Sequence, residues 1–251
     1  MDSKVLPAQA SRRDFLFKTI ALVPVASLAA CGPRESGAAD AQSTAALSPQ
    51  QQPTSAYSPK YFTAEEWAFI NAACGRLIPE DETGPGAVQS GVPEFIDRQL
   101  EGAFGHAARW YTQGPFMAAG PEFGYQGKAT PREVYRAGMA AINSHCIESR
   151  GGKAFADCDA ATQDEVLKDV ESGHIAFDEV PGKTFFMWLL QNTKEGYLAD
   201  PIHGGNKDMG AWKMIGFPGA RADFADWVTR HGVHYPLGPV GVAGSVARTK
   251  A

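Results

Sequence analysis

Helix-start signals followed by apolar residues at helical spacing limit the fold of this chain more than any other feature. The tetrapeptides TAEE (63–66) and TPRE (130–133) are capping boxes, in which a threonine and a glutamate three residues later satisfy the first free N–H groups of a helix. Asp159 begins another helix, and Gly173 ends it. Residues 185–197 form the most apolar helix, whereas alternating β-branched runs are almost absent. These patterns predict an all-α fold, a single compact helical domain with long ordered loops.

The N-terminus carries the twin-arginine export pattern. In the sequence SRRDFL, Arg12 and Arg13 precede Phe15 and Leu16, and a mildly apolar run continues to Ala30. This run is shorter than the ~20 residues that a membrane-spanning helix needs. A short amphipathic first helix is the alternative reading. We expect export through the Tat translocase, which carries folded proteins, and therefore a location in the periplasm.

The export signal ends in a sequence that resembles a bacterial lipobox. The run LAACG (28–32) predicts a signal peptide of residues 1–30 and lipid attachment at Cys31. Such a lipoprotein would be associated with the membrane. The alternative is ordinary cleavage further along the chain, for instance after Ala41.

The composition changes after the lipobox and predicts the domain boundaries. Residues 31–59 are rich in Ala, Ser, Gln and Pro, with almost no large apolar residue, which is typical of a flexible linker. The folded domain is expected over residues 60–236 and a flexible tail over residues 237–251. The net charge of −5 and the absence of a basic run argue against nucleic-acid binding.

Three cysteines follow Cys31, and an oxidising compartment would allow one disulfide between them. Cys146 and Cys158 flank the break at residues 150–152, so they could meet across a helix–loop–helix. Cys74 lies on the inner face of a predicted helix and is expected to be a buried, unpaired thiol.

The sequence contains no catalytic, cofactor-binding or metal site that its motifs support. No Gly-x-Ser-x-Gly turn is present, and residues 205–210 have P-loop spacing without the Lys and Ser/Thr that must follow. The Glu171-x-x-His174 pair is interrupted by Gly173. A rival hypothesis is a stand-alone periplasmic metal-binding lipoprotein or oxidoreductase, with ligands among His203, His231 and His234.

The segment GYLADPIHGGNKDMGAWKMIGFPG, residues 196–219, resembles a functional site most closely. On one reading its polar groups serve the loop backbone, with Asp208 capping a short helix over residues 209–215. On the other they form a rim that contacts another protein, together with the apolar helix 185–197. The candidate partner contacts are Tyr197, Asp200, His203, Asn206, Lys207 and Trp212.

Several segments together resemble one protein family, the gluconate 2-dehydrogenase subunit 3 family. They are the run FFMWLLQNTKEGYLADPIHGGNKDMGAWKMIGFPG (185–219), the run from Phe62 to Leu100, YTQGPF (111–116), TPREVYRAGMAAINSHC (130–146) and GGKAFAD (151–157). They cover most of residues 61–219, and the twin-arginine leader is also typical of the family. The lipobox at Cys31 departs from the family pattern, because it is not a universal feature.

The resemblance implies an accessory role. The family provides the small, or gamma, subunit of periplasmic FAD-dependent sugar and sugar-acid dehydrogenase complexes. The large subunit is a GMC-type flavoprotein that holds the FAD, and a multihaem cytochrome c carries haem c in many such complexes. The small subunit is non-catalytic, holds no cofactor, and brings the export signal for the large one. Membrane attachment would come from the lipid or from a partner.

Overall fold

The structure is a computed structural model that describes residues 57–111, 113–117, 119–175, 177 and 180–244. Its α-helices are α2 (Ala64–Leu77), α3 (Val92–Glu101), α4 (Pro131–Ser149), α5 (Ala160–Ser172), α6 (Gly182–Leu198) and α7 (Gly210–Ile215). Short 3-10 helices are η1 (Pro121–Phe123), η2 (Phe155–Asp157), η3 (Pro201–His203), η4 (Lys207–Met209) and η5 (Ala222–Trp227). The described residues form two isolated β-bridges but no strand, so the predicted all-α fold is confirmed. Within the same residues, no helix is both long and apolar enough to cross a membrane.

The helices begin where the capping signals predicted. Thr63 and Thr130 each accept a hydrogen bond from the backbone N–H of the glutamate three residues later, and each glutamate accepts one in return. The Asp159 side chain caps α5, and α5 ends at Gly173, which has a φ of 81°.

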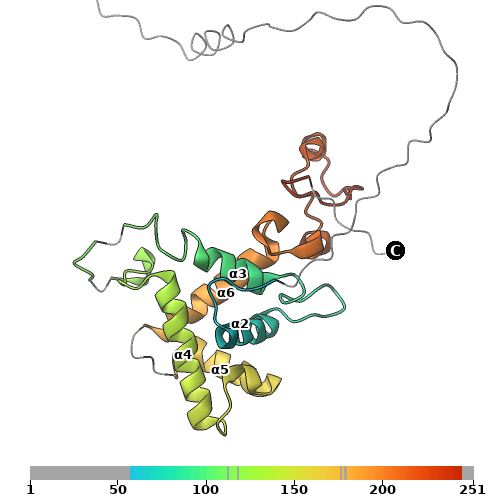
Figure 1. Cartoon of the computed structure of the whole chain (residues 1–251). Coiled ribbons are helices and arrows are strands. Elements are labelled where there is room, and N and C mark those ends of the chain that lie inside the picture. Colours follow the sequence, from blue (N-terminus) through green and yellow to red (C-terminus); the bar gives the residue numbers. More distant parts are fainter. Residues whose placement is uncertain (1–56, 112, 118, 176, 178–179, 245–251) are drawn as a thin grey trace, which may run out of the picture. The chain divides into compact units, whose positions relative to one another are not determined.

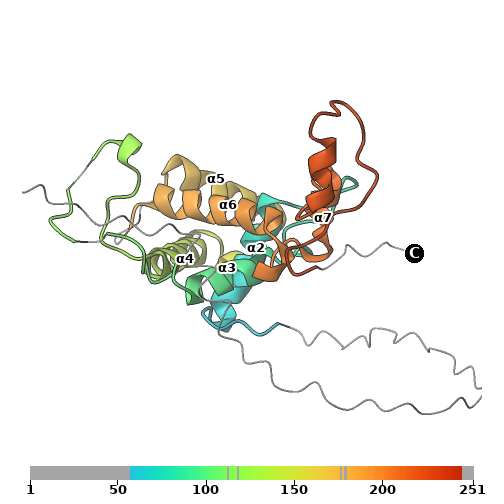
Figure 2. The ribbon, with the colours of Figure 1, turned by 90° about the horizontal axis from the view of Figure 1, so that it is seen from above.

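Helix α6 is the centre of the core. It packs against α3, α4 and α5, and Figures 1 and 2 show it running between them. Phe185 and Leu189 are completely buried. The Tyr135 hydroxyl of α4 accepts a hydrogen bond from the Asn192 amide at 2.9 Å, and burial raises the pKa of this tyrosine well above its ordinary value. The apolar face of α6 is therefore occupied by the core of the domain itself.

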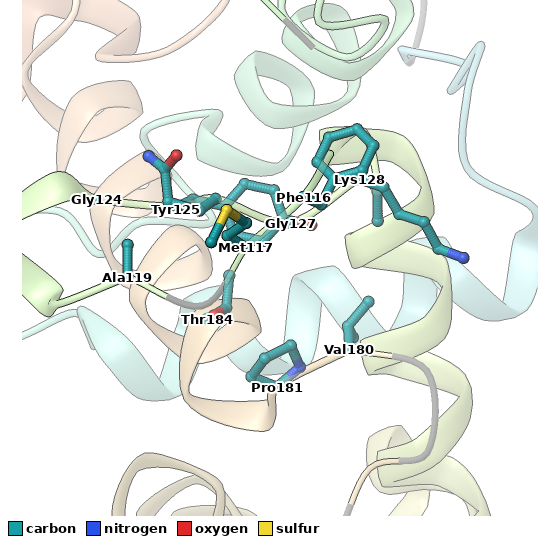
Figure 3. Close-up of a pocket in the computed structure, with 12 residues that line it drawn as sticks. Phe116, Met117, Ala119, Gly124, Tyr125, Gly127, Lys128, Val180, Pro181 and Thr184 are labelled. Carbon is teal, nitrogen blue, oxygen red and sulfur yellow. The ribbon is translucent and has the colours of Figure 1, made fainter. Parts of the chain in front are cut away.

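The long segment of residues 102–129, called here the aromatic loop, is packed at both ends and exposed in its middle. Trp110 and Tyr125 contact Trp188 of α6, with ring centroids 5.7 and 4.8 Å apart. Between these two anchors, large apolar side chains point away from the core. An open groove separates this part of the loop from the start of α6 (Figure 3). The described ends of the loop therefore pack on the domain, whereas the described side chains between them are exposed.

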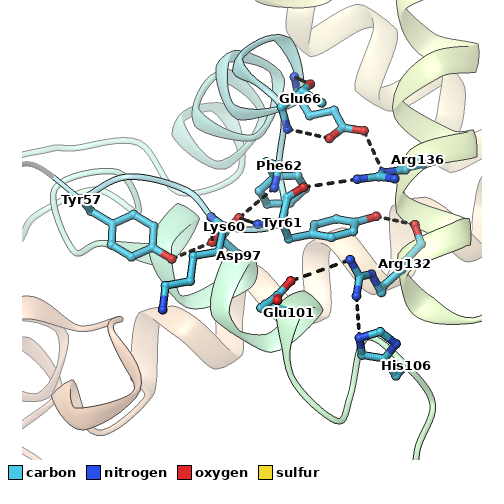
Figure 4. A network of polar contacts seen from close by, with 11 residues as sticks. Tyr57, Lys60, Tyr61, Phe62, Glu66, Asp97, Glu101, His106, Arg132 and Arg136 are labelled. Carbon is cyan, nitrogen blue, oxygen red and sulfur yellow. Dashed lines mark hydrogen bonds and ion pairs between the residues drawn. The ribbon is translucent and has the colours of Figure 1, made fainter.

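A buried carboxylate fastens the beginning of the domain to α3 (Figure 4). Asp97 is completely buried and accepts four hydrogen bonds. Three come from the backbone N–H groups of residues 60–62, at 2.8, 3.0 and 3.0 Å, and one from the Tyr57 hydroxyl at 2.6 Å. Tyr61 is held further by Arg132 and Arg136, whose guanidinium groups lie over its ring.

The packed domain extends beyond the predicted boundaries at both ends. Tyr57, expected in the linker, is bonded to Asp97. Val240 and Val242, expected in the tail, are also held: the backbone of Val240 pairs with that of residues 218 and 220, and the N–H of Val242 donates to Asp200 at 2.7 Å. Arg12 and Arg13, predicted to form the export signal, and Cys31, predicted to carry a lipid, lie outside the described residues.

The three described cysteines are buried, free thiols. Burial raises the pKa of Cys74 to about 12, and its sulfur lies 3.6 Å from the Thr193 hydroxyl. Burial, followed by the neighbouring Cys158 thiol, raises the pKa of Cys146 to about 11. Cys146 and Cys158 are therefore adjacent, and the disulfide between them stays a prediction.

Candidate functional site

The segment of residues 196–219, called here the signature segment, contains the end of α6, η3, η4 and α7. Asp200 organises its first turn. One carboxylate oxygen accepts from the Ile202 N–H at 3.0 Å, and the other accepts from Val242 in the C-terminal part of the chain. The Asp200 carboxylate is thus occupied by two backbone donors.

Asn206 holds the middle of the signature segment together. It is completely buried with a φ of 45°, its amide nitrogen donates to the Ala199 carbonyl at 3.0 Å, and its amide oxygen accepts from the Ala211 N–H at 3.1 Å. The prediction that Asp208 caps the short helix is wrong. Asp208 is exposed inside η4, and the Asn206 side chain satisfies the N–H at the start of α7 instead.

Tyr197 and Trp212 are also internal. The Tyr197 hydroxyl donates to the Pro85 carbonyl at 2.8 Å, and the Trp212 indole N–H donates to the Leu198 carbonyl at 2.8 Å. Trp212 also makes an edge contact with Phe217 at 5.1 Å. The loop is therefore held in shape by Tyr197, Asn206 and Trp212, which are buried and not available on its surface. This agrees with the interpretation in which the polar groups of the segment bond to its own backbone.

An ion pair joins the signature segment to α3. The Lys207 ammonium lies 2.6 Å from one oxygen of Glu94, which is buried, and Arg98 contacts the other oxygen. Two glycines allow the segment to pack closely on its neighbours, Gly204 against α3 and Gly205 against α6. Gly204 has a φ of 96°, and a Cβ on Gly205 would lie 2.1 Å from the backbone oxygen of Gly196.

The exposed surface of the signature segment is more apolar than predicted. Among the candidate contacts, His203 and Lys207 are exposed and Asp200 is half-buried. Beside them stand exposed apolar side chains that the sequence reasoning did not single out: Ile202, Met214, Ile215 and Phe217. Large apolar residues inside a glycine-rich, polar stretch were the signal that could have identified them. A groove of about 760 Å³ separates this surface from the acidic turn at residues 80–84.

The histidines of the rival metal hypothesis are not brought together into a site. His203, His231 and His234 are all exposed, and His174 pairs with Asp169 at 3.4 Å. Within the described part of the chain, no group of three His, Cys, Asp or Glu residues could hold a metal ion. What the segment offers on its surface is a mixture of polar and exposed apolar side chains.

One protein-family model matches the chain. The family model described as Gluconate 2-dehydrogenase subunit 3 matches residues 64–219, from the first residue of α2 to the end of the signature segment. The match covers more than half of the chain. No curated protein and no solved structure matches it. The chain belongs to the gluconate 2-dehydrogenase subunit 3 family.

Proposed function

We propose that this protein is the non-catalytic small subunit of a periplasmic FAD-dependent dehydrogenase that acts on a sugar, a polyol or a sugar acid such as gluconate. It stabilises the flavoprotein large subunit and exports it through the Tat pathway. The family match over residues 64–219 carries the proposal, because subunit 3 of such an enzyme is an accessory subunit. In this complex the FAD belongs to the large subunit, and haem c belongs to a cytochrome subunit where one is present.

The N-terminal sequence supports the export role. Arg12 and Arg13 form the twin-arginine signal, and the Tat translocase accepts folded proteins. A large subunit without its own signal can therefore cross the membrane bound to this chain. Lipid attachment at Cys31, or contact with a membrane-bound partner, then holds the complex at the membrane.

The described fold supports the accessory role. Its core is filled by helices, and Asp97, Asn206 and Glu94 all satisfy structural donors or cations of the chain itself. Exposed apolar side chains remain in the aromatic loop and around the signature segment. A rigid scaffold with apolar surface outside its core is typical of a subunit that binds a larger protein.

Co-purification tests the proposal. The chain, tagged at its C-terminus, is expressed in its native host, and the proteins that elute from periplasmic and membrane fractions are identified. We expect a stoichiometric flavoprotein with a flavin absorbance spectrum. Replacing Arg12 and Arg13 with Lys should leave both proteins in the cytoplasm. Replacing Lys4 and Lys18 with Arg, outside the motif, should leave export unchanged. A wild-type chain that is exported and folded without any flavoprotein refutes the proposed function.

A further inference from the structure

The middle of the aromatic loop is an exposed, apolar surface with few charges. Residues 111–123 include four large apolar side chains with high exposed fractions: Tyr111 (88%), Met117 (72%), Phe123 (66%) and Phe116 (48%). Only one residue of these thirteen, Glu122, is charged, whereas 20% of the whole chain is charged. Exposing such a run to water costs free energy, and an exposed apolar surface of this kind marks an interaction site.

The loop presents these side chains from a fixed base. Trp110, directly before the exposed residues, makes edge contacts with Phe104 at 6.3 Å and with Trp188 at 5.7 Å. Tyr125, directly after them, contacts Trp188 at 4.8 Å and Trp110 at 6.3 Å. Both ends of the exposed segment are therefore held on α6, which lowers the entropy lost when a partner binds.

Three of the exposed side chains, Tyr111, Phe116 and Met117, line open grooves outside the core of the domain. Figure 3 shows Phe116 and Met117 across an open space from Pro181 and Thr184 at the start of α6, a groove of about 470 Å³. A second groove of about 490 Å³ is lined by Tyr111, Phe116 and Met117 among others. Two open grooves therefore lie beside the loop, and the side chains of a binding partner would fill them.

The area involved approaches what a stable interface needs. A buried aromatic or similarly large side chain contributes about 150–250 Å², so the four exposed fractions sum to on the order of 500 Å². One partner of a standard interface contributes about 800 Å². Four side chains therefore provide more than half of that area, and the walls of the two grooves add to it.

We propose that the side chains of Tyr111, Phe116, Met117 and Phe123 insert into an uncharged, apolar recess of the flavoprotein large subunit. This inference rests on the proposed function and names the surface through which it acts. The loop extends away from the helices, on the side opposite the C-terminal segment (Figures 1 and 2). Two protruding loops that met across a two-fold axis would bury little beyond their tips. A recess in a larger partner covers all four side chains and both grooves.

The decisive experiment compares two triple variants of the tagged full chain in the co-purification described above. The loop variant carries Tyr111→Ser, Met117→Ser and Phe123→Ser. The matched control carries Val228→Ser, Val233→Ser and Leu237→Ser, which are exposed by 61, 57 and 48% in the C-terminal segment. We expect the loop variant to recover at least about tenfold less flavoprotein, because buried aromatic anchors dominate binding free energy. The control should recover as much as wild type.

Each outcome separates the inference from the proposed function. Because all three loop side chains are exposed, the loop variant should keep the wild-type thermal unfolding midpoint, which is measured on the purified chain. If wild type and the loop variant recover the flavoprotein equally, the inference is overturned and the proposed function stands. If wild type recovers none, the proposed function itself fails. A purified wild-type chain that is dimeric, and that the loop substitutions make monomeric, would assign the loop to a second copy and also overturn the inference.

Discussion

Replacing Asp97 with Asn should loosen the N-terminal side of the domain without changing the volume of its core. One oxygen of Asp97 accepts from the N–H groups of Tyr61 and Phe62, and the other accepts from the Tyr57 hydroxyl and the Lys60 N–H. An asparagine has nearly the same shape, but one of its two terminal atoms is an NH₂ donor. With the NH₂ at the Oδ1 position, two backbone N–H groups face a donor. At the Oδ2 position only the Lys60 N–H does, because the Tyr57 hydroxyl can rotate and accept.

The expected loss follows from these four contacts. A hydrogen bond to a charged acceptor contributes about 1.5–3 kcal/mol net and one to a neutral acceptor about 0.5–1.5 kcal/mol, so one lost bond together with the weakening of the others costs about 3–6 kcal/mol. Removing a buried charge offsets part of this cost, and we expect the free energy of unfolding to fall by about 3 kcal/mol. Tyr57→Phe is the matched control, because it removes one hydrogen bond and should cost about 1–2 kcal/mol.

Urea unfolding followed by circular dichroism measures the change, and limited proteolysis shows where it acts. Cleavage between residues 57 and 63 should be faster in Asp97→Asn than in Tyr57→Phe, since the segment loses more of its bonds to α3. If Asp97→Asn matches wild type in both its urea midpoint and its cleavage rate, the four hydrogen bonds do not hold this segment, and the reasoning is refuted.

Three further predictions concern the signature segment, alkaline stability and the cysteines. Asn206→Ala leaves the Ala199 carbonyl and the Ala211 N–H unpaired and should cost about 2–4 kcal/mol in urea unfolding. Asn206→Asp keeps the oxygen that accepts from the helix but sets a second oxygen against the Ala199 carbonyl at a completely buried position, so it should be destabilising as well. Burial raises the pKa of Tyr61 and of Cys74 to about 12 in the folded state, from 10.0 and 9.0. Their contribution to stability is therefore present below pH 9 and is lost as the pH rises toward 12. Urea titrations at pH 8 to 11 should show this decline, with a later onset in Cys74→Ala. Oxidised glutathione should join Cys146 to Cys158, which peptide mass spectrometry detects as the loss of two hydrogens, and should raise stability by roughly 3 kcal/mol. Alkylation of Cys146 or Cys158 in the oxidised, unfolded chain would contradict that pairing.

The helix boundaries could be predicted because their causes are local. Thr63, Thr130 and Asp159 act on N–H groups within three residues, and Gly173 supplies the left-handed conformation that ends α5. These interactions depend on neighbours in the sequence, so the pattern of residues is sufficient to identify them.

The details of the site could not be predicted because their causes are distant in the sequence. The donors to Asp97 lie 35 to 40 residues away, and nothing around Asp97 distinguishes it from an exposed acidic residue of a helix. In the signature segment, Asn206, Asp208 and Met209 all adopt positive φ, which moves the capping group two residues earlier than expected. Positive φ is common for Asn and Asp but unusual for Met, and here it is imposed by packing: Met209 is buried.

Helix α3 explains why a chain with so many loops can still present fixed surfaces. It is buried on nearly every side, so its two inward acidic residues need partners from elsewhere in the chain. Asp97 receives the segment that follows the linker, and Glu94, one turn earlier, receives Lys207 of the signature segment. The C-terminal end of the same helix leads directly into the aromatic loop, where Phe104 contacts Trp110. This ten-residue helix thus contacts the segment that follows the linker and the signature segment, and it leads into the loop that we assign to the partner contact. It follows that a Glu94→Gln variant, which weakens the contacts of Lys207 and Arg98 but leaves Asp97 unchanged, should speed hydrogen exchange in residues 204–211. Exchange at the Tyr61 and Phe62 amides, which donate to Asp97, should be unchanged. If exchange at these two amides is also faster, the Glu94 and Asp97 contacts are not independent, and the loss of one loosens the other.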